Sequence, residues 1–302
     1  MQASSQRIME KHKAGFVNII GNPNVGKSTL MNRLVGEKLS IITPKAQTTR
    51  HRIFGIINGD DFQIVISDTP GIINPHHSLH KSMMQFVETA IKDADIVLYM
   101  TDIYDNPEKN PIYVEKVSKI DLPTLVIINK IDLSNQLEVE KKVEEWKRLI
   151  PNASVLPVSA QYNMNVDLVL KYILNNLPDG EAYYPKDTLT DKTMRFIVSE
   201  LIREKIFLNY QKEIPYSVEV VVDSYKESEK MVRIEATIFT ERESQKRIII
   251  GHKGEMIKRV GIEARADIEA FIEQHVFLGL HVKVDPDWRN NSQRLARFGY
   301  IN

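Results

Sequence analysis

The first residues whose types and spacing could do chemistry lie in GNPNVGKST, residues 21–29. Gly21, Gly26, Lys27 and Ser28 satisfy the pattern G-x-x-x-x-G-K-[ST]. A glycine-rich turn that opens a helix directs backbone N–H groups and the positive end of the helix dipole at a phosphate. In such a loop the lysine reaches the β- and γ-phosphates, and the serine hydroxyl binds Mg²⁺. The apolar run before the loop and the helical pattern after it favour a nucleotide site over a simple glycine-rich turn. We expect the neighbouring residues to line this site as well: Asn22, Pro23, Asn24, Val25 and Thr29.

The base of the nucleotide is suggested by NKID, residues 129–132, which follows the apolar run TLVII. A carboxylate at Asp132 can accept hydrogen bonds from both the N1–H and the exocyclic amine of guanine, and adenine has no such pair of donors on that edge. Asn-Lys-x-Asp alone is also an ordinary polar turn. VSA, residues 158–160, follows the next apolar run, and there a backbone N–H could meet the guanine oxygen. We therefore predict a guanine site that includes Asn129, Lys130, Asp132, Ser159 and Ala160.

Two further motifs between these regions predict a Mg²⁺ site. Asp68 of DTPG closes the run FQIVIS and could hold Mg²⁺ through a water, while the Gly71 amide senses the γ-phosphate. One hydroxyl of the pair Thr48 and Thr49 could complete the Mg²⁺ shell only while a γ-phosphate is present, and we favour Thr49. A proline-glycine turn and a solvated threonine pair are the alternatives. Mg²⁺ is thus expected on Ser28, Thr49 and Asp68, with catalytic roles for Asn24, Lys27, Thr49 and Gly71.

The elements that must position these motifs form an alternating pattern. Short apolar runs recur between amphipathic segments from residue 16 to 177, which predicts an α/β sheet with helices on both faces. Only NGDD separates the second run from the third, so these strands should form an antiparallel hairpin whose glycine takes a positive φ. The sheet is therefore expected to be mixed. Residues 178–191 carry two prolines and a glycine without periodicity, as a linker does.

Residues 192–285 predict a smaller α+β domain, with an extension at residues 1–15 and a tail at 286–302. The expected order is a helix from residue 192 to about 207, two extended runs, a helix after Gly254 and a last short strand. Five apolar residues of the long helix follow roughly helical spacing and are expected in the core: Ile257, Ile262, Ala266, Ile268 and Phe271.

The loop before this helix reads Gly251-His252-Lys253-Gly254. Without side chains, a GXXG loop lets the backbone approach a nucleic-acid backbone closely, and the helix N-terminus behind it favours phosphate. Residues 245–260 contain five basic residues against the single acidic Glu255. We predict an RNA site that consists of Lys246, Arg247, Gly251, His252, Lys253, Gly254, Lys258 and Arg259.

Composition limits the function classes only weakly. The 302 residues include 40 basic and 40 acidic residues, so the net charge neither attracts nor repels nucleic acid or an anionic membrane. The absence of cysteine excludes disulfides and thiolate metal sites, and it is compatible with the reducing cytoplasm in which we expect the protein. No run of about eighteen uncharged apolar residues occurs, so we expect no membrane span. Peripheral membrane attachment stays open.

GNPNVGKS, the TT pair, DTPG, NKID and VSA together resemble the Ras-like P-loop GTPases over residues 16–177. In that family a glutamine commonly follows the DxxG glycine and orients the attacking water, and here that position is Ile72. The chain is in this respect similar to bacterial GTPases that lack this glutamine. In related members the asparagine that matches Asn24 helps to bind K⁺. The resemblance therefore implies slow turnover that K⁺ or a partner stimulates.

The second domain resembles a KH domain of the α-β-β-α-α-β kind, and a Ras-like GTPase joined to such a domain is the arrangement of the Era family. PNVGKSTLMN, KAQTTRHRI, DTPGI, NKID, GHKGEMIK and ARADIE resemble its motifs closely. Asn22, where many members have arginine, and NPHHSLH depart from the pattern. The resemblance implies a GTP-hydrolysing switch that binds GTP or GDP with Mg²⁺, and small-subunit ribosomal RNA near its 3′ end. It also implies a role in maturation of the small ribosomal subunit and loose membrane association; we expect a monomer.

Two alternatives stay open at this point. The second domain could bind a protein or a membrane surface, although the GXXG loop and its basic residues favour RNA. The chain could also bind RNA after losing hydrolysis, because Ile72 cannot position water. If the leading interpretation holds, GTP orders the loops around Thr49 and Gly71, and their surface alters how the second domain presents its RNA face.

Overall fold

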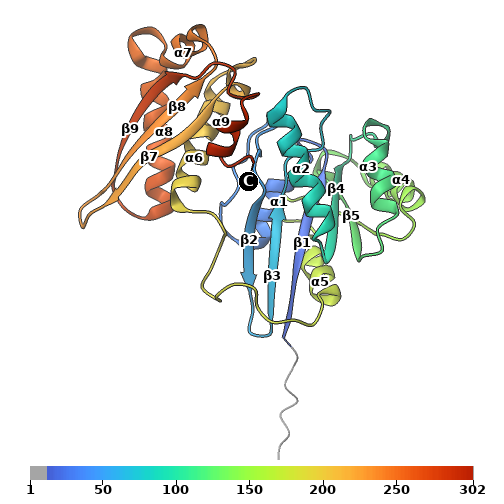
Figure 1. Cartoon of the computed structure of the whole chain (residues 1–302). Coiled ribbons are helices and arrows are strands. Elements are labelled where there is room, and N and C mark those ends of the chain that lie inside the picture. The colour runs from blue at the N-terminus through green and yellow to red at the C-terminus, as the bar shows by residue number, and fades with distance from the viewer. Residues whose placement is uncertain (1–11, 302) are drawn as a thin grey trace, which may run out of the picture.

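The computed structural model describes residues 12–301, except for the side chain of residue 109. An α/β unit and a smaller α+β unit lie side by side, each with its own sheet (Figure 1). In the described residues the first sheet has six strands in the order β2-β3-β1-β4-β5-β6. Only β2 runs antiparallel to its neighbour. The strands are β1 Lys13–Gly21, β2 Ile53–Asn58, β3 Phe62–Asp68, β4 Ile96–Asp102, β5 Thr124–Asn129 and β6 Ser154–Pro157. The predicted mixed sheet is confirmed.

Helices cover both faces of this sheet, because its central strands are apolar on both sides. Every residue of β4 and β5 is buried. One face packs against α2 Ser78–Lys92, α3 Pro111–Ser118 and α4 Gln136–Leu149, and the other packs against α1 Lys27–Val35 and α5 Val166–Asn176. The carboxyl ends of the parallel strands therefore meet at one edge, where the loops are free to bind a ligand.

The hairpin between β2 and β3 corrects one expectation. Gly59 does not have a positive φ. A Cβ at this position would instead lie 2.2 Å from the ring of Phe62. Glycine lets the aromatic ring of Phe62 lie over the turn, and a larger residue would displace the ring.

The second unit has the predicted α-β-β-α-α-β order. Its elements are α6 Met194–Asn209, β7 Glu219–Glu227, β8 Val232–Thr240, α7 Glu243–Ile250, α8 Glu255–Ile272 and β9 Val276–Val284. The sheet order is β7-β8-β9, with β7 antiparallel and β9 parallel to β8. The helices pack against one face of this sheet around a separate apolar core.

The buried face of α8 differs from the expectation. Val260, Ala264 and Ile268 are buried at i, i+4 and i+8, whereas Ile262 and Ala266 are exposed. Counting apolar residues did not separate the core face from an exposed apolar face of the same helix.

Residues 178–191 and 286–301 pack against the two units. Residues of the first segment form bridges with β1 and β2 through Asp179 and Thr190. The second segment forms α9 Ser292–Arg297, and its Trp288 and Tyr300 are buried in the cluster that also contains Leu79 of α2 and Phe239 of β8. Within the described part of the chain, no helix is long and apolar enough to cross a membrane.

Candidate functional site

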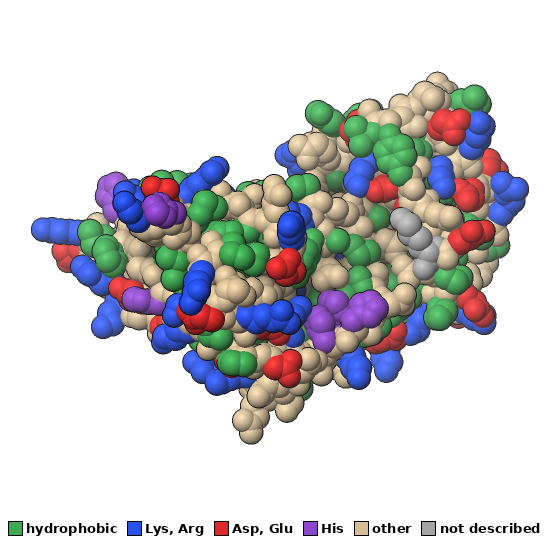
Figure 2. Space-filling model, turned by 90° about the horizontal axis from the view of Figure 1, so that it is seen from above, with side chains coloured by type: hydrophobic (Ala, Val, Ile, Leu, Met, Phe, Trp, Pro, Cys, Tyr) green, Lys and Arg blue, Asp and Glu red, His purple; other side chains and the backbone are tan. Residues whose placement is uncertain are grey.

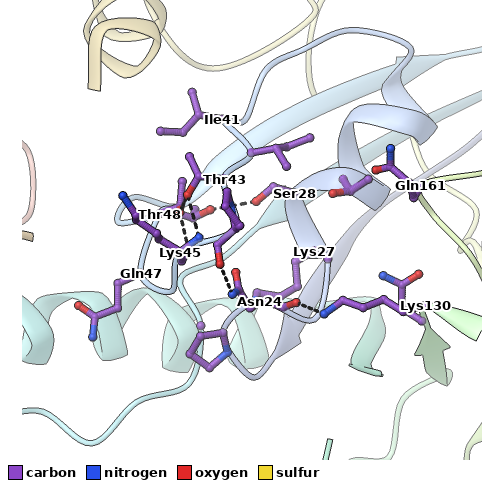
Figure 3. Close-up of a pocket in the computed structure, with 18 of the residues that line it drawn as sticks. Asn24, Lys27, Ser28, Ile41, Thr43, Lys45, Gln47, Thr48, Lys130 and Gln161 are labelled. Carbon is purple, nitrogen blue, oxygen red and sulfur yellow. Dashed lines mark hydrogen bonds between the residues drawn. The ribbon is translucent and has the colours of Figure 1, made fainter. Parts of the chain in front are cut away.

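A cavity of about 490 Å³ lies at the carboxyl edge of the first sheet, above the turn from β1 into α1. Figure 3 shows Asn24, Lys27 and Ser28 on one side of it, with Thr48 and Lys130 nearby. Gly26 has a φ of 103°, and a Cβ there would lie 2.3 Å from Asn129 Nδ2, so only glycine fits this turn. The predicted residues that line the cavity are Pro23, Asn24, Gly26, Lys27, Ser28, Thr29, Thr49, Gly71, Asn129, Lys130 and Asp132.

Lys27 is buried and folds back over the loop. Its Nζ donates to the carbonyl oxygens of Gly21 and Asn22 at 3.1 and 2.8 Å. Burial lowers the pKa of Lys27 to about 8, against the opposing effect of the Asp68 and Asp105 carboxylates. The Lys27 amine thus lies at the cavity, where its hydrogen bonds to the two loop carbonyls can be replaced by hydrogen bonds to a phosphate.

Ser28, Thr49 and Asp68 converge although they are far apart in the sequence. Ser28 Oγ donates to Asp68 Oδ2 at 2.6 Å and lies 2.9 Å from Thr49 Oγ1. Thr49 Oγ1 also donates to Asp68 Oδ2, at 3.2 Å. Thr48 instead bonds to Thr43 Oγ1 and to the Lys45 carbonyl. The geometry therefore favours Thr49 over Thr48 as the hydroxyl of this cluster.

These three side chains fit a Mg²⁺ ion. Two hydroxyls and a carboxylate are the hard oxygen donors that Mg²⁺ prefers. Asp68 Oδ1 is buried and has no hydrogen-bond partner among the described residues. Burial raises the pKa of Asp68, and Lys27 opposes this shift. An unpaired buried carboxylate oxygen is costly unless a cation or its water satisfies it.

Asn129 joins the loops around the base site. Its Nδ2 donates to the Val25 carbonyl at 2.7 Å, and its Oδ1 accepts from the Ala160 N–H at 2.9 Å. Lys130 crosses the same site, where its Nζ donates to the Asn24 carbonyl and to Asp102 Oδ2. Both side chains thus hold the loop of residues 21–28 against the end of β5.

Asp132 is oriented by Ser159, whose Oγ donates to Asp132 Oδ1 at 2.5 Å. The sequence did not indicate this role for the hydroxyl. The N–H of Ser159 donates to the Met164 carbonyl, and the N–H of Ala160 donates to Asn129. The backbone donor expected for the guanine oxygen is thus already paired, so it would have to share its hydrogen bond with the base.

Three loop residues expected at the site, Gly21, Asn22 and Val25, do not line the cavity, and Val25 is buried in the apolar core with Leu30. The Asn22 side chain donates to Asp105 Oδ2 at 2.7 Å and accepts from Asn110, so only its backbone reaches the loop. Ile72 is 2% exposed and packs in the core with Leu79 and Met83. An alkyl group in this position contributes nothing polar to the cavity.

The GXXG loop is a tight turn between α7 and α8. Gly251, Lys253 and Gly254 all have positive φ values, of 73°, 50° and 81°. A Cβ on Gly251 would lie 2.7 Å from Met256 Cβ, whereas a Cβ on Gly254 would meet nothing within 4 Å. His252 and Lys253 are exposed at the tip. Open space beside Gly254 leaves room for a ligand backbone.

A groove of about 500 Å³ runs between α8 and β9, and its lining on α8 starts at Ile257, three residues after this loop. It explains why Ile262 and Phe277 are 54% and 44% exposed, because both line the groove. Lys258 lines it too, Lys246 is half-buried, and Arg247 and Arg259 are exposed nearby. Arg259 pairs with Glu263 at 2.9 Å. Sequence reasoning missed the groove residues Gly261, Ile262, Arg265, Phe277, Leu278 and Leu280.

Figure 2 views the molecule from above. At the end that the second unit forms, it shows lysine, arginine and histidine side chains interspersed with apolar side chains and some acidic ones. Basic groups beside an apolar groove match the phosphates and bases of single-stranded nucleic acid.

The fold and the two sites define a class of protein: a P-loop GTPase domain joined to a KH domain. Residues 16–130 match the family model described as a 50S ribosome-binding GTPase, and residues 213–289 match the KH domain model. The chain is 44% identical over 296 residues to the chloroplastic GTPase ERA1 of Zea mays, across 96% of this chain and 71% of that protein.

Solved structures of Era are also similar to this chain. A crystal structure of Era with MgGDPNP and nucleotides 1506–1542 of 16S ribosomal RNA is 38% identical, with a TM-score of 0.92 over 96% of this chain and 100% of that one. An Aquifex aeolicus Era variant bound to GDP and AlF₄⁻ has the same identity, coverage and TM-score. The chain belongs to the Era family of GTPases.

Proposed function

We propose that this GTPase binds the 3′ region of small-subunit ribosomal RNA through its KH groove and assists maturation of the small ribosomal subunit. The observation that carries the proposal is the GXXG turn beside a basic and apolar groove, in a chain that aligns over 96% of its length with an RNA-bound Era. Flexible single strands suit such a groove, because unstacked bases can enter it while their phosphates meet the basic rim.

The nucleotide residues act as follows in this proposal. Lys27 leaves its loop carbonyls for the β- and γ-phosphates, and Gly71 meets the γ-phosphate through its amide. Ser28, Thr49 and Asp68 would hold Mg²⁺. Bound Mg²⁺ supplies charge neutralisation at the phosphates. Asp132 accepts the two guanine donors while Ser159 fixes its orientation.

Hydrolysis in this proposal is slow without help, because Ile72 occupies the position of the water-orienting glutamine. Asn24 would contribute its side-chain oxygen to a K⁺ site, because its Nδ2 donates to the Pro44 carbonyl, and K⁺ would supply positive charge near the phosphates. We expect faster turnover in K⁺ than in Na⁺, measured as phosphate release at matched ionic strength. Equal and fast rates in the two salts without a partner would count against this part.

The RNA role is tested by Gly254→Asp, with Gly36→Asp as the matched control. Both glycines have similar positive φ values, 81° and 86°, and a Cβ at either meets nothing within 4 Å. Backbone strain is therefore comparable, but only Gly254 belongs to the GXXG loop. Binding to a single-stranded RNA from the 16S 3′ end should be lost in Gly254→Asp and retained in Gly36→Asp. Equal loss in both variants would assign the effect to strain.

We place this function in the cytoplasm, where a monomer acts on the small subunit and associates loosely with the membrane surface. The support is the family resemblance and a sequence free of cysteine. The Zea mays relative is chloroplastic by name.

A further inference from the structure

The segment that carries Thr48 and Thr49 is held by the KH unit. Arg203 of α6 has a side chain that is 1% exposed, and its Nη2 donates to the Thr48 carbonyl oxygen at 2.6 Å. Its Nε and Nη2 also bind the two carboxylate oxygens of Glu200, at 2.7 and 2.5 Å. The Thr48 carbonyl belongs to the peptide that precedes Thr49. A buried guanidinium therefore fixes the backbone directly before the hydroxyl of the Mg²⁺ cluster.

The same segment also donates hydrogen bonds to the KH unit. Lys45 Nζ donates to the carbonyls of Phe207 and Tyr210 at the end of α6. Arg50 donates to the Val218 carbonyl at 2.7 Å and to the carbonyls of residues 215 and 216 at 3.1 Å. Residues 45–50 are thus tied to the KH unit on both sides of the threonine pair.

We propose that Arg203 is a positioning residue for GTP hydrolysis, through which helix α6 of the RNA-binding unit sets the place of the Thr49 hydroxyl. This inference rests on the proposed role of Thr49 as a Mg²⁺ ligand. Charge-assisted hydrogen bonds are short and directional, and an error in the position of a catalytic group lowers the rate steeply. Arg203 touches neither nucleotide nor metal in this role. Any RNA-driven shift of α6 is transmitted to the chemistry through its bond to Thr48.

The test combines Arg203→Met with Glu200→Gln, so that no buried carboxylate is left without its partner. Arg203→Lys keeps a charged donor and should retain part of the function. Arg195→Met is the matched control, because Arg195 lies on the same helix but donates only to the Val222 and Asp223 carbonyls of β7. Thr49→Ala is made in the wild-type and in the double-variant background. Thermal unfolding of each full-length variant reports any general loss of stability.

Two affinities are measured with Mg²⁺: that for a nonhydrolysable GTP analogue and that for GDP. Thr49 is expected to contribute only when a γ-phosphate is present, so the double variant should lose at least about fivefold in preference for the analogue over GDP. Its kcat should fall while GDP affinity stays unchanged. In the Thr49→Ala background the Arg203 change should have no further effect.

The outcomes separate the inference from the function on which it rests. If Thr49→Ala leaves the preference for the analogue unchanged, the proposed Mg²⁺ role of Thr49 fails. If Thr49→Ala lowers that preference but the Arg203 variants do not, only the positioning inference fails. A lower melting temperature with unchanged preference would reduce Arg203 to a structural role.

Discussion

At the scale of single residues, we expect the choice of base to depend on the Asp132 carboxylate. Asp132→Asn replaces one acceptor oxygen with an amide donor, which faces the exocyclic amine of guanine. Charged hydrogen bonds contribute about 1.5–3 kcal/mol each, so losing one of them and making the other neutral should weaken GTP binding on the order of a hundredfold. Xanthosine triphosphate has a carbonyl in place of that amine and should bind the variant better than GTP does. Competition binding with the two nucleotides measures this exchange.

Ser159→Ala tests how much the orientation of the Asp132 carboxylate contributes. It removes the hydroxyl that donates to Asp132 but keeps the carboxylate. We expect a smaller loss of GTP affinity and no gain for xanthosine triphosphate. A preference for GTP that survives in Asp132→Asn would show that another group reads the base.

A second prediction at this scale concerns pH and Lys27. Burial lowers the pKa of Lys27 to about 8 in the free protein, so the amine loses its charge as the pH rises through this value. Bound phosphates favour the charged amine and raise its pKa, and binding above pH 8 therefore takes up a proton. GTP affinity should fall between pH 7 and pH 9.5, and calorimetry in buffers of different ionisation enthalpy should detect the uptake. A Lys27→Met variant with the same pH dependence would assign the effect to other groups.

Residue motifs were predictable where the chemistry is local. The loop of residues 21–28 and the NKID segment follow from short-range patterns, and these residues meet at one cavity. The partners of Asn22 and Asp132 were not predictable, because Asp105 and Ser159 are 83 and 27 residues away. The sequence had pointed to the Ser159 and Ala160 backbone, and only the structure shows that both N–H groups have partners.

At the scale of elements, the proposed RNA groove between α8 and β9 offers both charge and apolar contact, and two residues of α8 test them separately. Lys258→Gln removes a basic group at the groove and should lower the salt dependence of RNA binding by about 0.7 in the log–log slope. Ile262→Ser removes an exposed apolar wall and should weaken binding about fivefold with an unchanged slope. Titrations at several salt concentrations distinguish the two. Identical slopes and affinities in the wild type and both variants would mean that RNA does not bind in this groove.

The helices and strands themselves were largely predictable, because burial on one or both faces imposes a period on the sequence. The exceptions have physical causes. Ile262 lines the exposed groove and does not lie in the core, so helical spacing alone assigned it to the wrong environment. Gly59 accommodates the Phe62 ring instead of a positive φ, a contact that depends on the hairpin having formed.

At the scale of the whole molecule, the sequence suggested two units and a linker but not how they meet. Arg50 and Arg203 bond to backbone carbonyls more than 150 residues away, and no local pattern encodes such contacts. Trp288 and Tyr300 of the last segment are buried in the core cluster that α2 shares with β8. The two units therefore share a packed interface, and a change at the threonine pair has a direct path to α6.

The most direct test of this account is the affinity of the full-length protein for a single-stranded RNA from the 16S 3′ end, measured with a nonhydrolysable GTP analogue and with GDP. Because residues 45–50 contact both the nucleotide cavity and α6, the two states should differ by at least about fivefold in RNA affinity. By linkage, the RNA should change the preference for the analogue over GDP by the same factor. Equal RNA affinities in the two states would contradict the coupling, and no binding in either would contradict the RNA function itself.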